Sequence, residues 1–463
     1  MKEKEKILIV IPGNLYVRNY ILTNVFSELE QLYECDFIAS EEITIRASLE
    51  SKSTFKGYYI VDSKMKALHQ KIFNLMMWRY RNRSTSFLFR SNRTAPDFKR
   101  SIKAPYYRVP FRLLKWMILK PFINLRRKLI DIDFLYKKYE KFLKKKVITN
   151  QKLRSFITSK RYSLVLLPAS GYSVEGIDIA ILCEELRMKS LFLVDNWDNL
   201  SSKTIIWKKP SHIGVWGEQS RQHAQAIQNF SDDSISILGT PRFDDYFNLR
   251  DSSLDSHFAE DYILFVGTAL NFDEESVLGE IDHIIDNNKG LWGNLKLVYR
   301  PHPWRQNSIQ VKKTYGNHII TDPQILENSK DKSTRTQPNL DYYPSLIQNS
   351  EFIIGGLTSM LIESLIFHKQ FLALVHKDEN LVTNMRNTWK SFEHFRGLTK
   401  VEGVSFSLSK NDLEQEMINC WKNKESINTE KIDIDRDWYL HEDGFGYKSR
   451  LISCVKNLIE ATH

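Results

Sequence analysis

The fold of this chain is restricted above all by an alternation of short apolar runs with helical patterns. "ILIVIPGNLYVRNYILTNVF", from Ile7 to Phe26, is an apolar run, a glycine turn and a helical stretch, and "YILFVGTALNF", from Tyr262 to Phe272, repeats that order in mid-chain. Continuous β-branched runs that alternate with helices are typical of buried parallel strands. Each half of the chain therefore predicts its own doubly wound sheet.

The predicted strands divide into two groups of five. The first group is Ile7–Ile11, Ser163–Pro168, Leu191–Asp195, His212–Trp216 and Ile235–Leu238; the second is Tyr262–Val266, Leu295–Tyr299, His318–Thr321, Glu351–Ile354 and Phe371–Val375. A chain of 463 residues exceeds what one hydrophobic core usually serves. We predict an α/β fold of two Rossmann-like domains that face a central cleft. Residues 1–247 form the first, 258–440 the second, and a helix over 441–463 can pack back on the first.

A basic segment interrupts the first predicted domain, as a helical insertion over about residues 64–161. Lys99 to Arg161 holds 20 Lys and Arg against three acids, a net charge of +17, so the rest of the chain sums to −7. Its "PFRLLKWMILKPFINLRRK" mixes basic with large apolar residues, which is typical of a helix lying on anionic lipid. The sequence thus predicts a peripheral protein on the inner face of the cytoplasmic membrane. A solvated insertion that packs on its own domain is the alternative; nucleic-acid binding is not expected, because no reader motif accompanies the charge.

Cysteine spacing and the first residues bear on compartment and cofactor. Cys35, Cys183, Cys420 and Cys454 lie far apart without metal-ligand spacing, which predicts neither disulfides nor a zinc site. The first apolar run is too short for a signal peptide or a membrane span. We expect a protein of the reducing cytosol that requires no cofactor and no metal.

The strongest local motif is "EFIIGGLTSMLIESLIFHKQFLALV", a strand, a Gly-Gly turn, a helix and a second strand. Gly356 lets the backbone approach a ligand, and Thr358 or Ser359 can cap the helix and donate to a phosphate. Glu363, about one turn further, can accept hydrogen bonds from ribose hydroxyls. The alternative is an ordinary capped turn with an exposed Glu.

A second motif, "LVYRPHPW", ends a predicted strand in Arg300 and His302, which prolines hold in place. A guanidinium and an imidazole beside a glycine-rich helix start predict a diphosphate clamp, which offsets charge on a departing nucleotide. Gly267 and Thr268 end a further strand at the same edge, and their backbone N–H groups are expected to reach the donor phosphates. A histidine near proline is also frequently structural.

In the first half, "DNWDNLSSK" follows a buried strand. Asp195 or Asp198 is the candidate catalytic base, Trp197 can stack on a sugar ring, and Lys203 can reach a phosphate. Asn, Asp and Ser are also common loop formers, so one aspartate can simply fix the turn.

Other loops add weaker candidates. On the acceptor side they are Gly13, Asn14 and Arg18 after the first strand, and Ser170 and Tyr172 after the second, where Glu175 is a second possible base. Glu393, His394 and Arg396 in "SFEHFRG" follow the last clear strand and are a third weak candidate. Every doubly wound domain has turns of this type, so each carries little weight alone.

"RPHP" followed by "DYYPSLIQNSEFIIGGLTSMLIESLIFHKQFLAL" resembles the C-terminal domain of GT-B-fold glycosyltransferases that build bacterial surface polysaccharides such as capsule, O-antigen and lipopolysaccharide. The capsule-synthesis and CDP-glycerol glycerophosphotransferase groups are the most similar. "ILGTPRFDDY", with Arg242, resembles their segment near the domain junction. The resemblance covers about residues 235–375. It implies donor-binding roles for Arg242, Arg300, His302, Thr358, Ser359 and Glu363.

One departure separates the reactions that this resemblance allows. The glycerophosphotransferases usually carry a His-Gly pair in the N-terminal domain, and this chain has none. Sugar transfer is therefore favoured: a metal-independent glycosyltransferase that moves a sugar from a nucleotide sugar to a lipid-linked or growing surface glycan. His302 is counted with Asp195 and Asp198 as catalytic.

The alternatives are phosphoglycerol or phosphoribosyl transfer, a nucleotide-sugar 2-epimerase, and a non-catalytic membrane-bound scaffold. The sugar, the nucleotide base, the stereochemical course and the acceptor linkage depend on pocket shape, which residue types do not specify.

Overall fold

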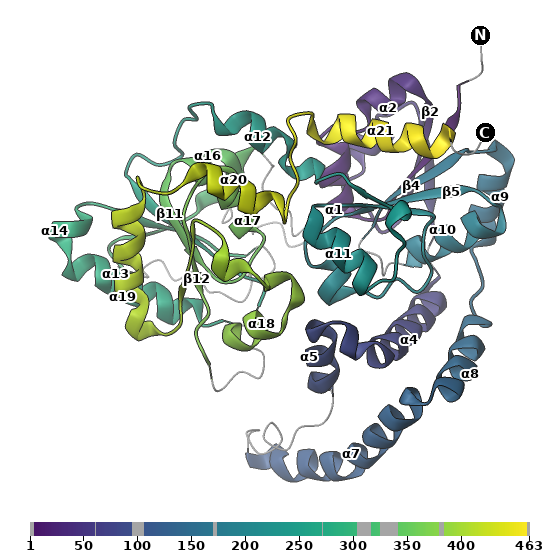
Figure 1. Cartoon of the computed structure of the whole chain (residues 1–463), viewed down its shortest axis with the longest axis horizontal. Helices are drawn as coiled ribbons and strands as arrows, with labels where there is room; N and C mark the ends of the chain where they lie inside the picture. Colours follow the sequence, from purple (N-terminus) through teal and green to yellow (C-terminus); the bar gives the residue numbers. More distant parts are fainter. Residues whose placement is uncertain are drawn as a thin grey trace. The chain divides into compact units, whose positions relative to one another are not determined.

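The computed structural model describes residues 4–60, 62–94, 106–169, 174–270, 272–302, 316–324, 341–378 and 384–460. The chain divides into two compact units (Figure 1). Unit 1 comprises Met1–Pro241, Phe392–His394 and His441–His463, and unit 2 comprises Arg242–Ser391 and Phe395–Leu440. The predicted acceptor residues Ser170 and Tyr172 lie outside the described residues, and so does the side chain of Glu175.

Unit 1 is built on a seven-stranded parallel sheet in the order β3-β2-β1-β4-β5-β6-β7. The five predicted strands appear as β1 (Lys6–Ile11), β4 (Leu164–Ala169), β5 (Lys189–Val194), β6 (His212–Val215) and β7 (Ile235–Ile237). The two strands that the sequence did not predict are β2 (Glu34–Ser40) and β3 (Phe55–Tyr59). β2 begins Glu-Cys-Asp and β3 is an edge strand with partly exposed residues, so neither shows a continuous apolar run.

The helices of unit 1 bury their apolar sides on this sheet. They are α1 (Asn14–Tyr16), α2 (Ser27–Leu32), α3 (Ala47–Glu50), α10 (Val174–Glu185), α11 (Glu218–Ala226) and α21 (Gly446–Glu460), with π-helical turns η1 (Val17–Ile21) and η4 (Asn199–Lys203). α21, the last helix of the chain, returns to the first strands: Leu451 and Val455 are buried in one core with Ile7 and Ile9.

Among the described residues, five α-helices belong to the insertion between β3 and β4. They are α4 (Ser63–Arg79), α5 (Thr85–Thr94), α7 (Val109–Asp131), α8 (Asp133–Lys144) and α9 (Gln151–Lys160). The insertion has its own small core, in which Ile72, Phe87 and Tyr136 are buried. Among the described helices, none combines the length and the apolar content that crossing a membrane requires.

Unit 2 carries a six-stranded parallel sheet in the order β10-β9-β8-β11-β12-β13. The strands are β8 (Tyr262–Val266), β9 (Lys296–Arg300), β10 (Ile319–Thr321), β11 (Ser350–Gly355), β12 (Phe371–Leu374) and β13 (Val404–Ser407). β13, an edge strand that reads "VSFS", is the one that the sequence did not predict. The predicted fold class, two doubly wound α/β domains, is confirmed.

The helices of unit 2 cover this sheet. They are α12 (Asp244–Arg250), α13 (Glu274–Asn287), α14 (Lys289–Trp292), α16 (Tyr342–Gln348), α17 (Met360–Ile366), α18 (Met385–Ser391), α19 (Lys410–Asn423) and α20 (Thr429–Asp437). Asp273 caps α13 by accepting from the amide of Ser276 at 3.1 Å. This cap fixes the start of the helix that follows the β8 turn.

Candidate functional site

The predicted donor residues gather at the carboxyl ends of three adjacent strands in unit 2. β8 pairs with β9 on one side and with β11 on the other. Gly267 follows β8, Arg300 ends β9, and Gly356 follows β11. In open α/β sheets ligands bind outside this edge. The sheet order therefore brings together motifs that lie up to ninety residues apart in the sequence.

A glycine is required at position 267 because the chain after β8 lies very close to the chain after β9 there. A Cβ atom at this position would lie 2.6 Å from the backbone nitrogen of His302, so a side chain does not fit. The amide of Gly267 donates to the carbonyl of Arg300 at 2.8 Å, and the amide of Thr268 donates to Oε1 of Glu274 at 2.9 Å. The expectation that these two amides reach donor phosphates is thus corrected, because both are engaged within the protein.

Packing also requires a glycine at position 356. A Cβ atom there would lie 2.1 Å from the Met385 methyl and 2.7 Å from Cγ2 of Thr268. A side chain at position 356 therefore does not fit.

Arg300 is the most unusual charge in unit 2. Its side chain is only 5 % exposed, and it donates to the hydroxyl of Tyr343 at 2.7 Å with the guanidinium 5.2 Å from that ring's centroid. Within the described residues, its Nε has no hydrogen-bond partner and no carboxylate oxygen lies within 4.0 Å of its nitrogens. Burial opposes the charged guanidinium, but the hydroxyl of Tyr343 and the carboxylates of Glu363 and Asp322, which act at a distance, outweigh that effect and raise its pKa. Arg300 is therefore a cation without a carboxylate in contact, and it can still bind an anion.

Arg242 and Glu363 form a buried ion pair beside this cation. Nη2 of Arg242 lies 3.1 Å from Oε1 of Glu363 and 3.3 Å from the hydroxyl of Ser359, which itself donates weakly to Glu363 at 3.4 Å. Both charged side chains are about nine-tenths buried. The segment around Arg242 and the helix α17 are thereby joined, and the carboxylate of Glu363 is held in one orientation.

Ser359 occupies the N-cap position of α17, but its hydroxyl makes no capping hydrogen bond. The carbonyl of half-buried Thr358 accepts from the amide of Leu361 at 3.2 Å. α17 has seven residues, so its dipole is weak. The charged side chains therefore contribute more to the electrostatics of this sheet edge than the N-terminus of α17 does.

Sequence reasoning missed two buried acids and two tyrosines that complete the edge. Glu274, which holds the Thr268 amide, also accepts from the hydroxyl of Tyr299 at 2.7 Å. Asp322 accepts from the hydroxyl of Tyr342 at 2.8 Å. The "DYYPS" stretch contained the signal, since consecutive aromatic hydroxyls next to a predicted buried strand need polar partners.

In unit 1 the structure joins two predicted acceptor loops. Asp195, 1 % exposed at the end of β5, accepts from Nδ2 of Asn19 at 3.0 Å and from Nδ2 of Asn196 at 2.8 Å. Arg18 is also buried, and its guanidinium lies 3.4 Å from the Asn19 amide oxygen. The β1 turn and the β5 turn therefore share one hydrogen-bonded cluster, as the parallel order β1-β4-β5 allows.

Trp197 is not a stacking platform in this structure, and that expectation is corrected. The indole is 5 % exposed, donates to Oε1 of Gln219 at 2.8 Å and packs edge-on against His394 with centroids 5.0 Å apart. Nδ1 of His394 lies 2.9 Å from the hydroxyl of Ser202, and burial lowers the pKa of the imidazole to about 3. An aromatic residue in a turn can belong to the hydrophobic core, and tertiary packing buries Trp197 in this way.

Three further predicted residues form local pairs. Lys203 lies 3.0 Å from Asp198, with both side chains partly exposed. Asn14 donates to Thr44 at 2.8 Å and accepts from its amide at 2.8 Å, so it joins two loops. Gly13, half-buried ahead of α1, meets only the Tyr16 ring at 3.8 Å, which is ordinary contact.

The residues of "SFEHFRG" divide between the units. Glu393 and His394 belong to unit 1, where Oε2 of Glu393 accepts from the hydroxyl of Thr85 at 2.7 Å. Arg396 belongs to unit 2 and is exposed.

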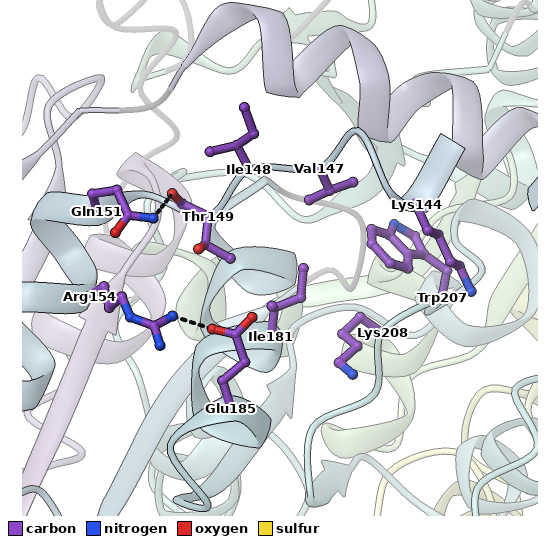
Figure 2. Close-up of a pocket in the computed structure, with 10 residues that line it drawn as sticks. All are labelled: Lys144, Val147, Ile148, Thr149, Gln151, Arg154, Ile181, Glu185, Trp207 and Lys208. Carbon is purple, nitrogen blue, oxygen red and sulfur yellow. Dashed lines mark hydrogen bonds and ion pairs between the residues drawn. The ribbon is translucent and has the colours of Figure 1, made fainter. Parts of the chain in front are cut away.

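A cavity of about 630 Å³ lies elsewhere in unit 1, between the end of α8, the start of α9 and the end of α10 (Figure 2). None of the predicted site residues lines it. Arg154 pairs with Glu185 across the cavity, and Lys208 pairs with Glu184. Trp207 forms one wall. Because its cations are already paired, this cavity does not match the chemistry that the motifs predict, and the strand ends are the stronger site.

Within the part of the chain that the structure describes, His, Cys, Asp and Glu side chains do not gather in threes as a metal ion would need.

The likenesses of this chain to known proteins lie in the fold. No protein-family model and no curated protein matches the sequence. A UDP-N-acetylglucosamine 2-epimerase from Listeria monocytogenes matches the structure with a TM-score of 0.51 at 9 % identity, over 99 % of this chain and 98 % of that one. UDP-GlcNAc 2-epimerase from Methanocaldococcus jannaschii gives 0.50 at 9 %, over 98 % and 99 %. A glycosyltransferase from Rickettsia africae gives 0.48 at 11 %, over 99 % of both chains.

The two parallel sheets and the full-length structural matches show that the chain has the GT-B fold. Proteins with this fold carry two Rossmann-like domains, each with a parallel sheet. At 9 % identity the likeness defines the architecture, and the chemistry has to be argued from the residues.

Proposed function

We propose that unit 2 binds the phosphates of a nucleotide-activated sugar and that the protein transfers the sugar to a glycan acceptor. The observation that carries this proposal is the Arg300 guanidinium, buried at a strand's carboxyl end with Tyr343 as its only described hydrogen-bond partner. A phosphate can accept two parallel hydrogen bonds from a guanidinium and neutralise its charge. An anionic donor is the ligand that such a position fits best.

The neighbours of Arg300 supply the remaining donor contacts in this proposal. His302 follows on the same strand end and adds a donor toward the phosphates as negative charge develops on the leaving nucleotide. Glu363, oriented by Arg242, accepts hydrogen bonds from ribose hydroxyls. No step of the reaction requires a metal ion.

On the acceptor side we propose Asp195, held by Asn19, as the base that receives the proton of the attacking hydroxyl. Asp198 is the second candidate, because it is more exposed. The acceptor in this proposal is a lipid-linked or growing surface glycan at the inner face of the cytoplasmic membrane. Capsule and O-antigen synthesis are the processes that use such acceptors.

Nucleotide binding is tested by thermal shift against UDP, CDP, GDP and ADP, each with pyrophosphate as a control. A ligand at a hundred times its Kd stabilises the folded state by about 2.7 kcal/mol. We expect UDP or CDP to raise the Tm and the His302→Ala variant to lower that shift. If none of the four changes the Tm, the donor site proposed here does not exist.

Catalysis is tested by nucleotide release from a panel of donors, with and without membrane-extracted glycan acceptors. We expect acceptor-dependent release, reduced at least tenfold in His302→Ala with the circular dichroism spectrum unchanged. Full activity of that variant would contradict the proposal. A donor preference for CDP-glycerol would assign phosphoglycerol transfer in place of sugar transfer.

A second candidate is epimerisation of a free nucleotide sugar. Full-length fold matches to two UDP-GlcNAc 2-epimerases favour it, at TM-scores of 0.51 and 0.50. Incubation with UDP-GlcNAc alone, followed by proton NMR, separates the two reactions. An epimerase interconverts the sugar without an acceptor, whereas a transferase leaves it unchanged.

A further inference from the structure

Two helices of the insertion, α7 and α8, leave a row of large apolar side chains in solvent. Along α7 these are Phe111, Leu114, Ile118, Phe122, Leu125 and Leu129, each between 42 % and 69 % exposed. α8 continues the feature with Phe134, 70 % exposed, and Phe142, 51 % exposed. Scattered apolar residues on a surface are normal, but a contiguous set of this size marks an interaction site.

The six residues on α7 form one stripe. At 100° per residue, their spacing of three and four confines them to an arc of about 80°. The residues that pack inward are on another face: Ile130 is buried and Ile123 is partly buried in the core of the insertion. In Figure 1, α7 runs along the outside of α4 and α5 within unit 1. α7 therefore packs on the core of the insertion through another face, and the stripe faces solvent.

The charge around this stripe has one sign. Residues 106–146 hold thirteen Lys and Arg against three acids. All three acids are already paired: Asp131 with Arg81 at 2.8 Å, Asp133 with Lys137 at 2.9 Å, and Glu140 with Lys144 at 2.8 Å. Helix geometry places Lys115 next to the stripe on one side and Lys128 on the other. Large apolar side chains flanked by cations fit the boundary between headgroups and acyl chains in an anionic bilayer.

We propose that α7 and α8 form the membrane-binding surface of this protein, with α7 in the plane of an anionic bilayer and its stripe inserted. The lysines beside the stripe then contact lipid phosphates. The proposal does not depend on the donor site, and either can fail without the other.

Charge complementarity favours a bilayer over two other occupants. A second copy of the chain would bring two strongly basic surfaces together, which is unfavourable. A nucleic acid would satisfy the charge but leave the phenylalanine and leucine side chains in water, since phosphate contacts alone supply non-specific binding.

The test is co-sedimentation of the full chain with vesicles of phosphatidylglycerol and phosphatidylcholine, against vesicles of phosphatidylcholine alone. We expect partitioning into the anionic vesicles that weakens between 50 mM and 500 mM salt. The triple variant Phe111→Ser, Ile118→Ser and Phe122→Ser should lower the partition coefficient at least tenfold.

A matched control separates insertion from a general loss of surface hydrophobicity. Leu32, Ile434 and Phe445 are 53 %, 66 % and 76 % exposed outside the insertion, and their triple serine variant should bind like wild type. Changing Lys115 and Lys128 to Gln should weaken binding about 30-fold at low salt, whereas Lys422 and Lys456 to Gln should not.

Three outcomes would overturn the proposal. The first is equal partitioning into both kinds of vesicle, or into neither. The second is full vesicle binding by the stripe variant together with loss in the lysine variant, which would mean adsorption by charge alone. The third is a dimer in light scattering that the stripe variant dissociates while vesicle binding is unchanged, which would assign the stripe to a second copy.

Discussion

Arg300 illustrates what a single residue contributes to this protein. Burying a guanidinium without a carboxylate in contact costs free energy, which the hydroxyl of Tyr343 and the more distant carboxylates of Glu363 and Asp322 offset. Arg436, also in unit 2, is equally buried but pairs with Asp433. The two arginines therefore differ in what they do for the fold, although residue type and burial are the same.

We expect Arg300→Met to change the Tm of the free protein little, because the lost attraction to Tyr343, Glu363 and Asp322 is offset by removal of the guanidinium's desolvation penalty. The thermal shift with nucleotide should disappear. Arg436→Met is the matched control and should destabilise by about 1 kcal/mol, since it removes an ion pair with Asp433, which is one-third exposed. Urea unfolding with and without nucleotide measures both effects. Destabilisation of similar size in both variants would mean that Arg300 is structural.

At the scale of elements, α21 shows how a distant segment completes a core. Leu451 is fully buried and shares the unit 1 core with Ile7 and Ile9, so the last helix shields one face of the strands that begin the chain. The insertion differs, because its helices bury their own smaller core. α21 therefore contributes to the stability of unit 1, whereas the insertion packs around a separate, smaller core.

We expect Leu451→Ala to destabilise unit 1 by about 3 kcal/mol through the cavity that it leaves. Ser449→Ala, an exposed position on the same helix, should change stability by less than about 0.5 kcal/mol. Chemical denaturation followed by tryptophan fluorescence gives both values. Equal, small effects in the two variants would show that α21 is not required for the core.

At the scale of the molecule, buried histidines link stability to pH. Burial lowers the pKa of His69 and His376 to about 4 and that of His394 to about 3. In the unfolded chain these imidazoles titrate near 6.5. Below that pH the unfolded state binds more protons than the folded state, so the free energy of unfolding falls as the pH falls.

We expect this loss to begin near pH 6.5 and to continue to about pH 4, with a slope of about 1.4 kcal/mol per pH unit for each of the three histidines. Replacing His69 by Gln should reduce the slope in unit 1. Replacing exposed His283 by Gln should not change the slope. Urea unfolding between pH 7.5 and pH 4.5 measures it. A stability that is constant down to pH 5 would contradict the buried, neutral imidazoles.

Much of the architecture follows from local sequence. Ten of the strands are recognisable in the sequence as apolar runs, because strands of a covered parallel sheet are buried on both faces. The three that the sequence did not reveal, β2, β3 and β13, begin with polar residues or lie at a sheet edge. Their pairing depends on neighbouring strands, which no local pattern contains.

Like the fold, the candidate site follows in part from the sequence and in part from the tertiary structure. The sequence by itself determined that Arg300, His302 and Glu363 end or follow buried strands, because chain order and strand polarity put them at one edge. Only the tertiary structure decided that the Thr268 amide is held by Glu274, that the Trp197 ring is buried, and that Arg242 meets Glu363. Hydrogen bonds and burial depend on which distant side chains arrive at the same place, and sheet order, not spacing along the chain, sets that arrangement.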